Sequence, residues 1–207
     1  MSSDAIATTS SSTSDVAVAA AMGIAEMGPP ASTLPRPPGS VRIRLTTTLP
    51  ATADWVATQL QTTALFRYIT APLLQFATVQ GPWPTHWPLG DTELRFALFG
   101  LVPMGRQTAR ISLHPCDGIP GAWPLLRDNG TGQLMRVWDH RITVHSLPGT
   151  PGRTCYTDEV FVRARYLPWV MTPISAAFAW VFYRHRQRRW LKLALRQPSA
   201  QGPGACA

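Results

Sequence analysis

The chain has 207 residues, which suits one domain with a tail or at most two small domains. Its hydrophobic fraction of 45% is typical of a globular protein, and its 20 prolines indicate many turns. The 19 lysines and arginines exceed the 11 acidic residues, and the formal net charge of +8 favours anionic neighbours such as nucleic acid or acidic lipid headgroups. The three cysteines lack the paired spacing of a disulfide framework or a metal site, which fits a reducing cytoplasm.

The composition divides the chain into a tail, a domain and a second tail. Residues 1–40 are dominated by Ser, Thr, Ala and Pro, and they offer little apolar surface to offset the entropy of ordering. We therefore expect a disordered tail over residues 1–40, a folded domain over 41–197 and a disordered tail over 198–207. No Lys or Arg precedes Arg36, so a secretory signal, which needs a basic start, is not expected.

The folded region opens with a strand. From Val41 onward, apolar and polar residues alternate with the period of two that is typical of a half-buried strand. A helix is expected next, capped by Thr52 or Asp54 and ended before Pro72. Antiparallel strands between this helix and a terminal one favour an α+β fold. The strand candidates are residues 74–79, 92–100 and 107–113, and a hairpin that pairs 133–145 with 154–163.

A long helix is expected between Tyr166 and Arg196, apolar in its first half and basic in its second. Pro168 and Pro173 bracket a short connection, and the apolar segment 174–183 would be about 15 Å long at 1.5 Å per residue. A bilayer core is about 30 Å thick, so we expect no stable transmembrane span. An apolar stripe with helical spacing is expected to be buried: Ile174, Ala177, Phe178, Val181, Phe182 and His185.

The basic end of this helix has four arginines within residues 184–189. The simplest interpretation is a solvated face that complements the negative carboxyl end of the helix. The alternative is an adaptor surface for anionic membranes or nucleic acid. No aromatic platform or base-reading motif accompanies the arginines, so nucleic acid is not an expected partner.

The predicted hairpin places apolar and polar residues together on one face. On its first strand Trp138, His140 and Ile142 alternate with polar neighbours and are expected to face inward. On the returning strand Tyr156 and Asp158 share a face. Ligand cavities combine many apolar walls with a few orienting polar groups, and this hairpin has that composition.

His140 is the candidate for acid–base chemistry. Beside Asp158 or Asp139 it could act as a general base, because a carboxylate would orient the imidazole. The alternative is a structural histidine with satisfied hydrogen bonds. His140 and His145 point to opposite faces of a strand, which argues against a metal site. The sequence has no phosphate loop, dinucleotide fingerprint or GxSxG elbow, so we expect neither a metal nor a cofactor.

The aromatic, proline-rich segment 81–88 has two interpretations. It could rim a cavity entrance, since loops of this kind often hold ligands. It could equally be a rigid connection whose rings cover the edge of the core.

Four segments together resemble the SRPBCC (START-like, polyketide cyclase/dehydrase) superfamily: Trp138-Asp139-His140-Arg141-Ile142, Gly152-Arg153-Thr154, Thr157-Asp158-Glu159-Val160, and residues 182–190 with their basic run. The resemblance covers residues 41–196. It implies a helix-grip fold, in which a curved antiparallel sheet wraps around a long C-terminal helix and leaves an apolar cavity. Most members bind hydrophobic small molecules, and a minority are cyclases or related enzymes.

The combined expectation is a cytoplasmic protein that binds a hydrophobic or amphipathic small molecule in an internal cavity without catalysis. The alternatives are a cyclase or dehydratase-type enzyme that uses His140 and Asp158 as catalytic residues, and the anionic-surface adaptor. The expected ligand-binding residues are Trp138, His140, Ile142, Tyr156, Phe178, Val181 and Phe182.

Overall fold

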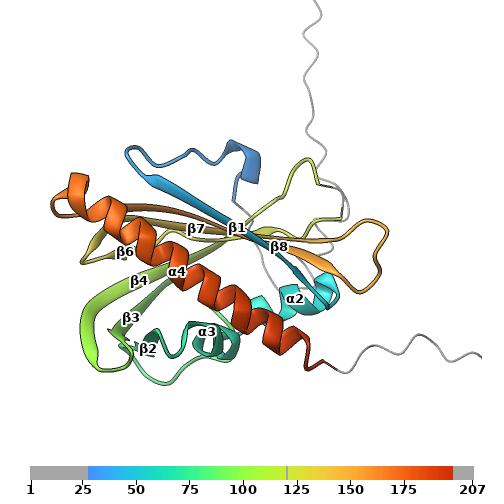
Figure 1. Ribbon diagram of the computed structural model, residues 1–207, viewed down its shortest axis with the longest axis horizontal. Coiled ribbons are helices and arrows are strands. Elements are labelled where there is room, and N and C mark those ends of the chain that lie inside the picture. The colour runs from blue at the N-terminus through green and yellow to red at the C-terminus, as the bar shows by residue number, and fades with distance from the viewer. Residues whose placement is uncertain (1–27, 120, 198–207) are drawn as a thin grey trace, which may run out of the picture.

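The computed structural model describes residues 28–119 and 121–197. Within them an eight-stranded antiparallel sheet curves around one long helix, α4 (Pro168–Ala194), which crosses one face of the sheet (Figure 1). The strand order is β1-β8-β7-β5-β4-β3-β2, and β6 pairs with β4 at the side. This is the α+β fold that the order of elements predicts, in the helix-grip form that the family resemblance implies.

The strands are β1 (Val41–Leu49), β2 (Leu74–Thr78), β3 (Gly90–Leu98), β4 (Val102–His114), β5 (Leu125–Asp128), β6 (Thr131–Gly132), β7 (Met135–Ser146) and β8 (Thr154–Ala164). The other helices are η1 (Ala31–Thr33), α2 (Ala53–Leu60) and α3 (Thr63–Thr70). The predicted hairpin is confirmed as β7–β8, in which Ser146 pairs with Thr154. The short strands β5 and β6 are absent from the sequence prediction, because four and two residues are too few to display a period.

The single helix expected before Pro72 is two helices. The Thr52 side chain accepts a hydrogen bond from the Trp55 N–H (3.3 Å), as a cap does, and α2 begins there. Thr62 then accepts from the Leu65 N–H (3.2 Å) and begins α3. The apolar residues continue with helical spacing across both helices, but Thr62 caps a new helix and so divides the predicted one.

Helix α4 includes the connection expected between Pro168 and Pro173, and it buries a different face from the one predicted. Pro168 occupies its first turn, where a missing N–H costs nothing, so the supposed connection up to Pro173 is helical. The predicted stripe is wrong at four of its six positions, which are exposed: Ile174, Ala177, Phe178 and Val181. The buried side of α4 mixes polar with apolar residues, so a search for an apolar stripe does not find it. Its residues are Thr172, Ala179, Phe182, Tyr183, Arg186, Gln187, Trp190 and Ala194. Among the described residues, no helix combines the length and hydropathy needed to cross a bilayer.

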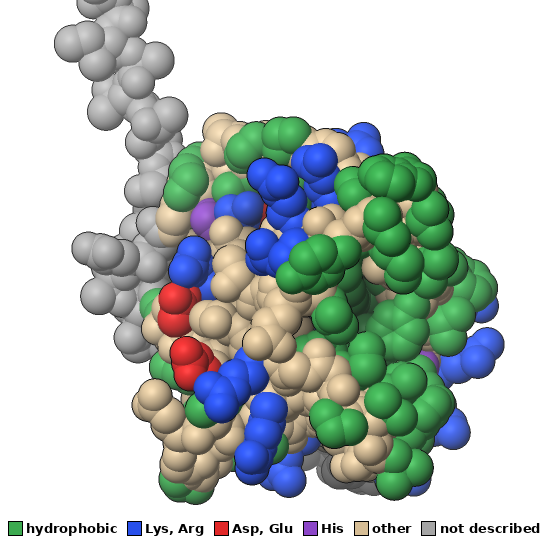
Figure 2. Space-filling view, turned by 90° about the vertical axis from the view of Figure 1, so that its left-hand side faces the viewer, with side chains coloured by type: hydrophobic (Ala, Val, Ile, Leu, Met, Phe, Trp, Pro, Cys, Tyr) green, Lys and Arg blue, Asp and Glu red, His purple; other side chains and the backbone are tan. Residues whose placement is uncertain are grey.

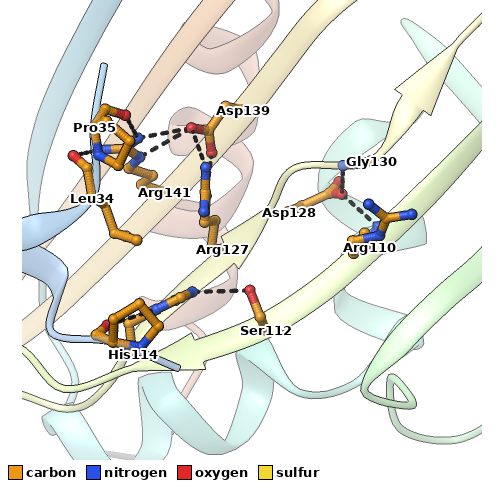
Figure 3. Close-up of polar contacts among 11 residues, drawn as sticks. Leu34, Pro35, Arg110, Ser112, His114, Arg127, Asp128, Gly130, Asp139 and Arg141 are labelled. Carbon is orange, nitrogen blue, oxygen red and sulfur yellow. Dashed lines mark hydrogen bonds and ion pairs between the residues drawn. The ribbon is translucent and has the colours of Figure 1, made fainter. Parts of the chain in front are cut away.

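Residues 28–40, which the composition assigns to a tail, pack against the face of the sheet opposite α4. The Gly28 N–H donates to the Leu113 carbonyl (2.8 Å), and the Ala31 N–H donates to the Pro115 carbonyl (2.8 Å). Arg141 Nη2 donates to the Pro35 carbonyl (2.7 Å), as Figure 3 shows. This part of the predicted tail belongs to the packed fold, because side chains of the sheet satisfy its carbonyls. Positions 1–27 and 198–207 lie outside the described residues.

Two groups of buried side chains form the core beneath α4. One includes Val56, Tyr156 and Trp190 and joins α2 and α3 to the C-terminal half of α4. The other includes Val160 and Phe182 and joins the middle of α4 to β8, β1 and β2. Both groups hold α4 against the sheet along its length, and the space left between them and β3–β5 is the site described next.

Candidate functional site

A cavity of about 610 Å³ lies between the inner face of the sheet and α4. Small-molecule sites commonly measure about 300–1,000 Å³. Aliphatic and aromatic side chains from α3, α4 and most of the strands form nearly all of its wall. Five of the residues predicted to bind a ligand line it: Trp138, His140, Ile142, Phe178 and Phe182.

The mouth of the cavity lies where α4 begins. Several lining residues are exposed there, including Tyr166, Leu167 and Ile174. Figure 2 shows this end of the molecule, where hydrophobic side chains surround a hollow. From the aromatic segment 81–88, Trp87 also lines the cavity, and Trp83 packs edge-on against it (6.0 Å between ring centroids).

Val181 and Tyr156, also predicted to bind a ligand, do not line the cavity. Val181 is one residue before the buried Phe182, and one residue of an α-helix corresponds to a rotation of about 100°. Its side chain therefore lies on the outer side of α4. Tyr156 is fully buried under the C-terminal half of α4, against Trp190 (6.0 Å between ring centroids). Both positions are corrections to the predicted site.

His140 and Asp158 meet, as the catalytic alternative requires. The His140 Nε2–H donates to Asp158 Oδ1 (2.8 Å), and both side chains are buried. Asp158 Oδ1 also accepts from the Tyr156 hydroxyl (2.8 Å), and its Oδ2 accepts from Gln187 Nε2 (3.0 Å). Every oxygen of this buried carboxylate therefore has a donor.

The protonation of this pair follows from its surroundings. Burial lowers the pKa of His140, because it disfavours the imidazolium more than Asp158 favours it. Burial also raises the pKa of Asp158, but the His140 hydrogen bond and the Arg186 charge outweigh this, so its pKa lies below the usual range. His140 is thus neutral with its proton on Nε2. Its Nδ1 has no hydrogen-bond partner among the described residues, and the side chain lines the cavity.

Asp128 is a cavity residue that sequence reasoning missed. It lies on β5 directly opposite His140 on β7. Its Oδ1 accepts from the backbone N–H groups of Arg110 (2.9 Å) and Gly130 (3.3 Å), as Figure 3 shows. Burial raises its pKa to about 6, against the opposing effect of those two bonds. Its sequence signal is weak, because the strand that positions it has four residues.

Arg186 is the second missed residue. The sequence assigns it to a solvated face, yet it is 5% exposed and lines the cavity. Its guanidinium lies over the rings of Tyr183 (4.8 Å) and Phe182 (5.8 Å). Burial lowers its pKa, but the charges of Tyr183, Asp158, Tyr156 and Asp128 together raise it by more, so Arg186 stays charged. Its position at i+4 from Phe182 on the buried side of α4 is the one signal that could have indicated burial.

On the opposite face of the sheet, Asp139 belongs to a separate ion cluster (Figure 3). It accepts two hydrogen bonds from Arg127 (2.7 and 2.9 Å) and one from Arg141 Nη2 (2.8 Å). Successive residues of a strand face opposite sides, so Asp139 cannot orient His140. The described residues include no group of three or more His, Cys, Asp or Glu side chains that could hold a metal ion.

No family model and no curated protein matches the sequence. Solved structures match the fold. The Zhui aromatase/cyclase from Streptomyces sp. R1128 superposes with a TM-score of 0.57 at 16% identity, over 79% of this chain and 98% of that one. A START superfamily protein from Mycobacterium smegmatis gives a TM-score of 0.53 at 12% identity, over 75% and 97%. A protein from Thermus thermophilus gives 0.51 at 10% identity, over 75% and 97%. The chain therefore has the START-like helix-grip fold, as the resemblance of its sequence implies.

Proposed function

We propose that the protein binds a hydrophobic or amphipathic small molecule in the cavity between the sheet and α4, without catalysing a reaction. The supporting observation is an apolar cavity of about 610 Å³ that opens beside the start of α4. Each 100 Å² of apolar ligand surface buried there would contribute about 2.5 kcal/mol. The cytoplasm stays the expected compartment, on the grounds of the sequence alone.

A matched pair of substitutions on α4 tests this proposal. Phe178 lines the cavity at its mouth, and Val181 is exposed nearby without lining it. A carboxylate in an apolar wall is unfavourable, so Phe178→Asp should weaken binding of the neutral apolar dye Nile red by about tenfold or more, equivalent to ~1.4 kcal/mol. Val181→Asp should leave it unchanged. Absence of dye binding to the wild type, or an equal effect of the two substitutions, would refute the proposal.

A second candidate is an enzyme of the cyclase or dehydratase type, and the contact between His140 and Asp158 favours it. Asp158 orients the imidazole through Nε2, so that Nδ1 can accept a proton from a ligand carbon next to a carbonyl. The electron pair left on that carbon would move onto the carbonyl oxygen, which the Arg186 charge would stabilise. The Gln187 hydrogen bond to Asp158 ties α4 to β8, however, and this structural role places catalysis second.

Proton transfer can be measured without knowing the natural ligand. The ketone 2-tetralone is incubated in D₂O with wild type and with His140→Gln, and deuterium incorporation next to the carbonyl is followed by NMR. A general base typically contributes about 10²–10⁴-fold, so a catalytic His140 predicts exchange at least tenfold faster with the wild type. Equal rates would reject this candidate.

The adaptor alternative gains little from the structure, because the basic run is not one continuous surface. Arg186 is buried, and Arg189 Nε donates to the Tyr68 carbonyl (2.7 Å). Arg184 lies over the Trp180 ring (5.3 Å) and is exposed, as is Arg188. Salt-sensitive binding to acidic liposomes or oligonucleotides would be needed to restore this alternative.

A further inference from the structure

Arg186 is a buried cation whose hydrogen-bond donors are not satisfied by the protein. Among the described residues no carboxylate lies within ion-pair distance of it, and its Nε is buried without a partner. A guanidinium has five N–H donors, and a buried charge that lacks partners is strongly unfavourable. The rings of Tyr183 and Phe182 offset part of this cost through their π faces. They also fix the position of the group but accept no N–H in its plane.

The hydrogen bonds that the nearby acidic groups make go to donors other than Arg186. Asp158 accepts from three side chains, and Asp128 Oδ1 accepts from two backbone N–H groups. The protein thus supplies charge near Arg186 but no acceptor in contact with it. Because Arg186 lines the cavity, an occupant of the cavity can supply that acceptor.

We infer that Arg186 binds the acidic head group of the ligand, and that the ligand is a monocarboxylic acid with a long or polycyclic apolar body. This inference rests on the proposed function. The planar guanidinium matches a carboxylate through two parallel hydrogen bonds. Arg186 is the one Lys or Arg that lines the cavity among the described residues, so a head group with two or more negative charges would lack counterions. The apolar wall suits the body of such an acid.

Asp128 adds a pH dependence to this arrangement. The groups that surround its carboxyl are Arg186 from α4, His140 from β7, the backbone N–H groups of Arg110 and Gly130, and Asp139 at longer range. A ligand carboxylate beside Arg186 brings a further negative charge, which favours the protonated form of Asp128. Binding of the acid therefore takes up a proton, and its affinity should fall as the pH rises above about 6.

The experiment compares dodecanoic acid with dodecan-1-ol as competitors of Nile red. The variants are Arg186→Met, which keeps the length of the side chain, and Arg184→Met, the matched control on the exposed side of α4. A hydrogen-bonded charge is worth about 1.5–3 kcal/mol, so Arg186→Met should weaken binding of the acid by roughly 10- to 100-fold. Binding of the alcohol should change by less than about threefold, since it loses no charged partner. Arg184→Met should change neither.

The outcomes separate the two proposals. If acid and alcohol bind the wild type equally and Arg186→Met changes neither, the inference is wrong while the binding function stands. If neither competitor nor the dye binds the wild type, both the binding function and this inference are wrong.

Arg186→Met removes a buried charge without partners and is expected to fold. Arg186→Lys, which keeps the charge without the planar fork, gives a second measure: intermediate affinity for the acid supports the inference, and unchanged selectivity in both variants contradicts it.

Discussion

Asp128 is a carboxyl group whose ionisation opposes folding. Its pKa is about 6 in the folded protein and 3.8 in an unfolded chain, so the folded state holds a proton that the unfolded state has lost between these values. Stability therefore falls as the pH rises from about 4 to about 6, and the full cost applies above that range. A shift of this size corresponds to a cost of at most about 3 kcal/mol.

Asp128→Asn should consequently stabilise the protein at pH 8 and leave it nearly unchanged at pH 4. The amide oxygen still accepts the backbone N–H groups of Arg110 and Gly130, but no charge is buried. Urea unfolding at the two pH values measures the difference, with a gain of roughly 1–2 kcal/mol expected at pH 8. A variant less stable than wild type at pH 8 would show that Asp128 ionises without penalty.

His140 should be neutral at pH 7 with its proton on Nε2, because its pKa is lowered by burial and Asp158 accepts at that nitrogen. Nitrogen-15 NMR of labelled protein distinguishes the two tautomers and the charged form. The unfolded chain binds a proton at pH values where the buried His140 does not, so the contribution of His140 to stability falls as the pH drops below about 6.5. A proton found on Nδ1 would remove the basis for a general base facing the cavity.

At the scale of elements, the helices and strands that the sequence predicts most clearly are those whose apolar residues recur with a regular period. The β7–β8 hairpin follows from the alternation around His140, and the long α4 follows from the absence of Gly and Pro between Pro173 and Pro198. The strand β5 and the burial of Arg186 have only weak signals in the sequence. One is too short to show a period, and the other depends on a helix face that mixes polar with apolar side chains. Because of these two omissions, the sequence-based site lacks Asp128 and Arg186, the acidic group and the cation that line the cavity.

The ordered segment 28–40 depends on the ion cluster beneath it. Asp139 is 2% exposed and accepts from Arg127 and Arg141, and Arg141 in turn donates to the carbonyls of Leu34 and Pro35. Removing one partner of a buried ion pair leaves the other charges uncompensated.

Asp139→Asn should therefore lower the free energy of unfolding by about 3 kcal/mol and increase hydrogen exchange of the Gly28 and Ala31 amides. The matched control is Asp91→Asn, which removes a similar two-bond contact with Arg110 at an exposed site. An exposed pair contributes little, so that variant should change much less. Equal destabilisation by both would show that burial of Asp139 is unimportant.

At the scale of the molecule, the fold leaves the apolar cavity between the sheet and α4 open at one end. Exposed apolar side chains such as Tyr166 and Ile174 line that opening, where a ligand can enter without unfolding any strand. A ligand that binds the folded state alone stabilises it by mass action. At a free concentration of about 100 times its Kd, dodecanoic acid should add about 2.7 kcal/mol to the free energy of unfolding. An unchanged unfolding curve at that concentration would contradict binding to the folded protein.

Native mass spectrometry of the purified protein tests the central claim most directly. The wild type should carry one small molecule per chain, which organic extraction recovers as a monocarboxylic acid, and Phe178→Asp should carry less of it while Val181→Asp carries the same amount. A wild type that is free of small molecules and that also binds no Nile red at saturating concentration would contradict a ligand-binding cavity.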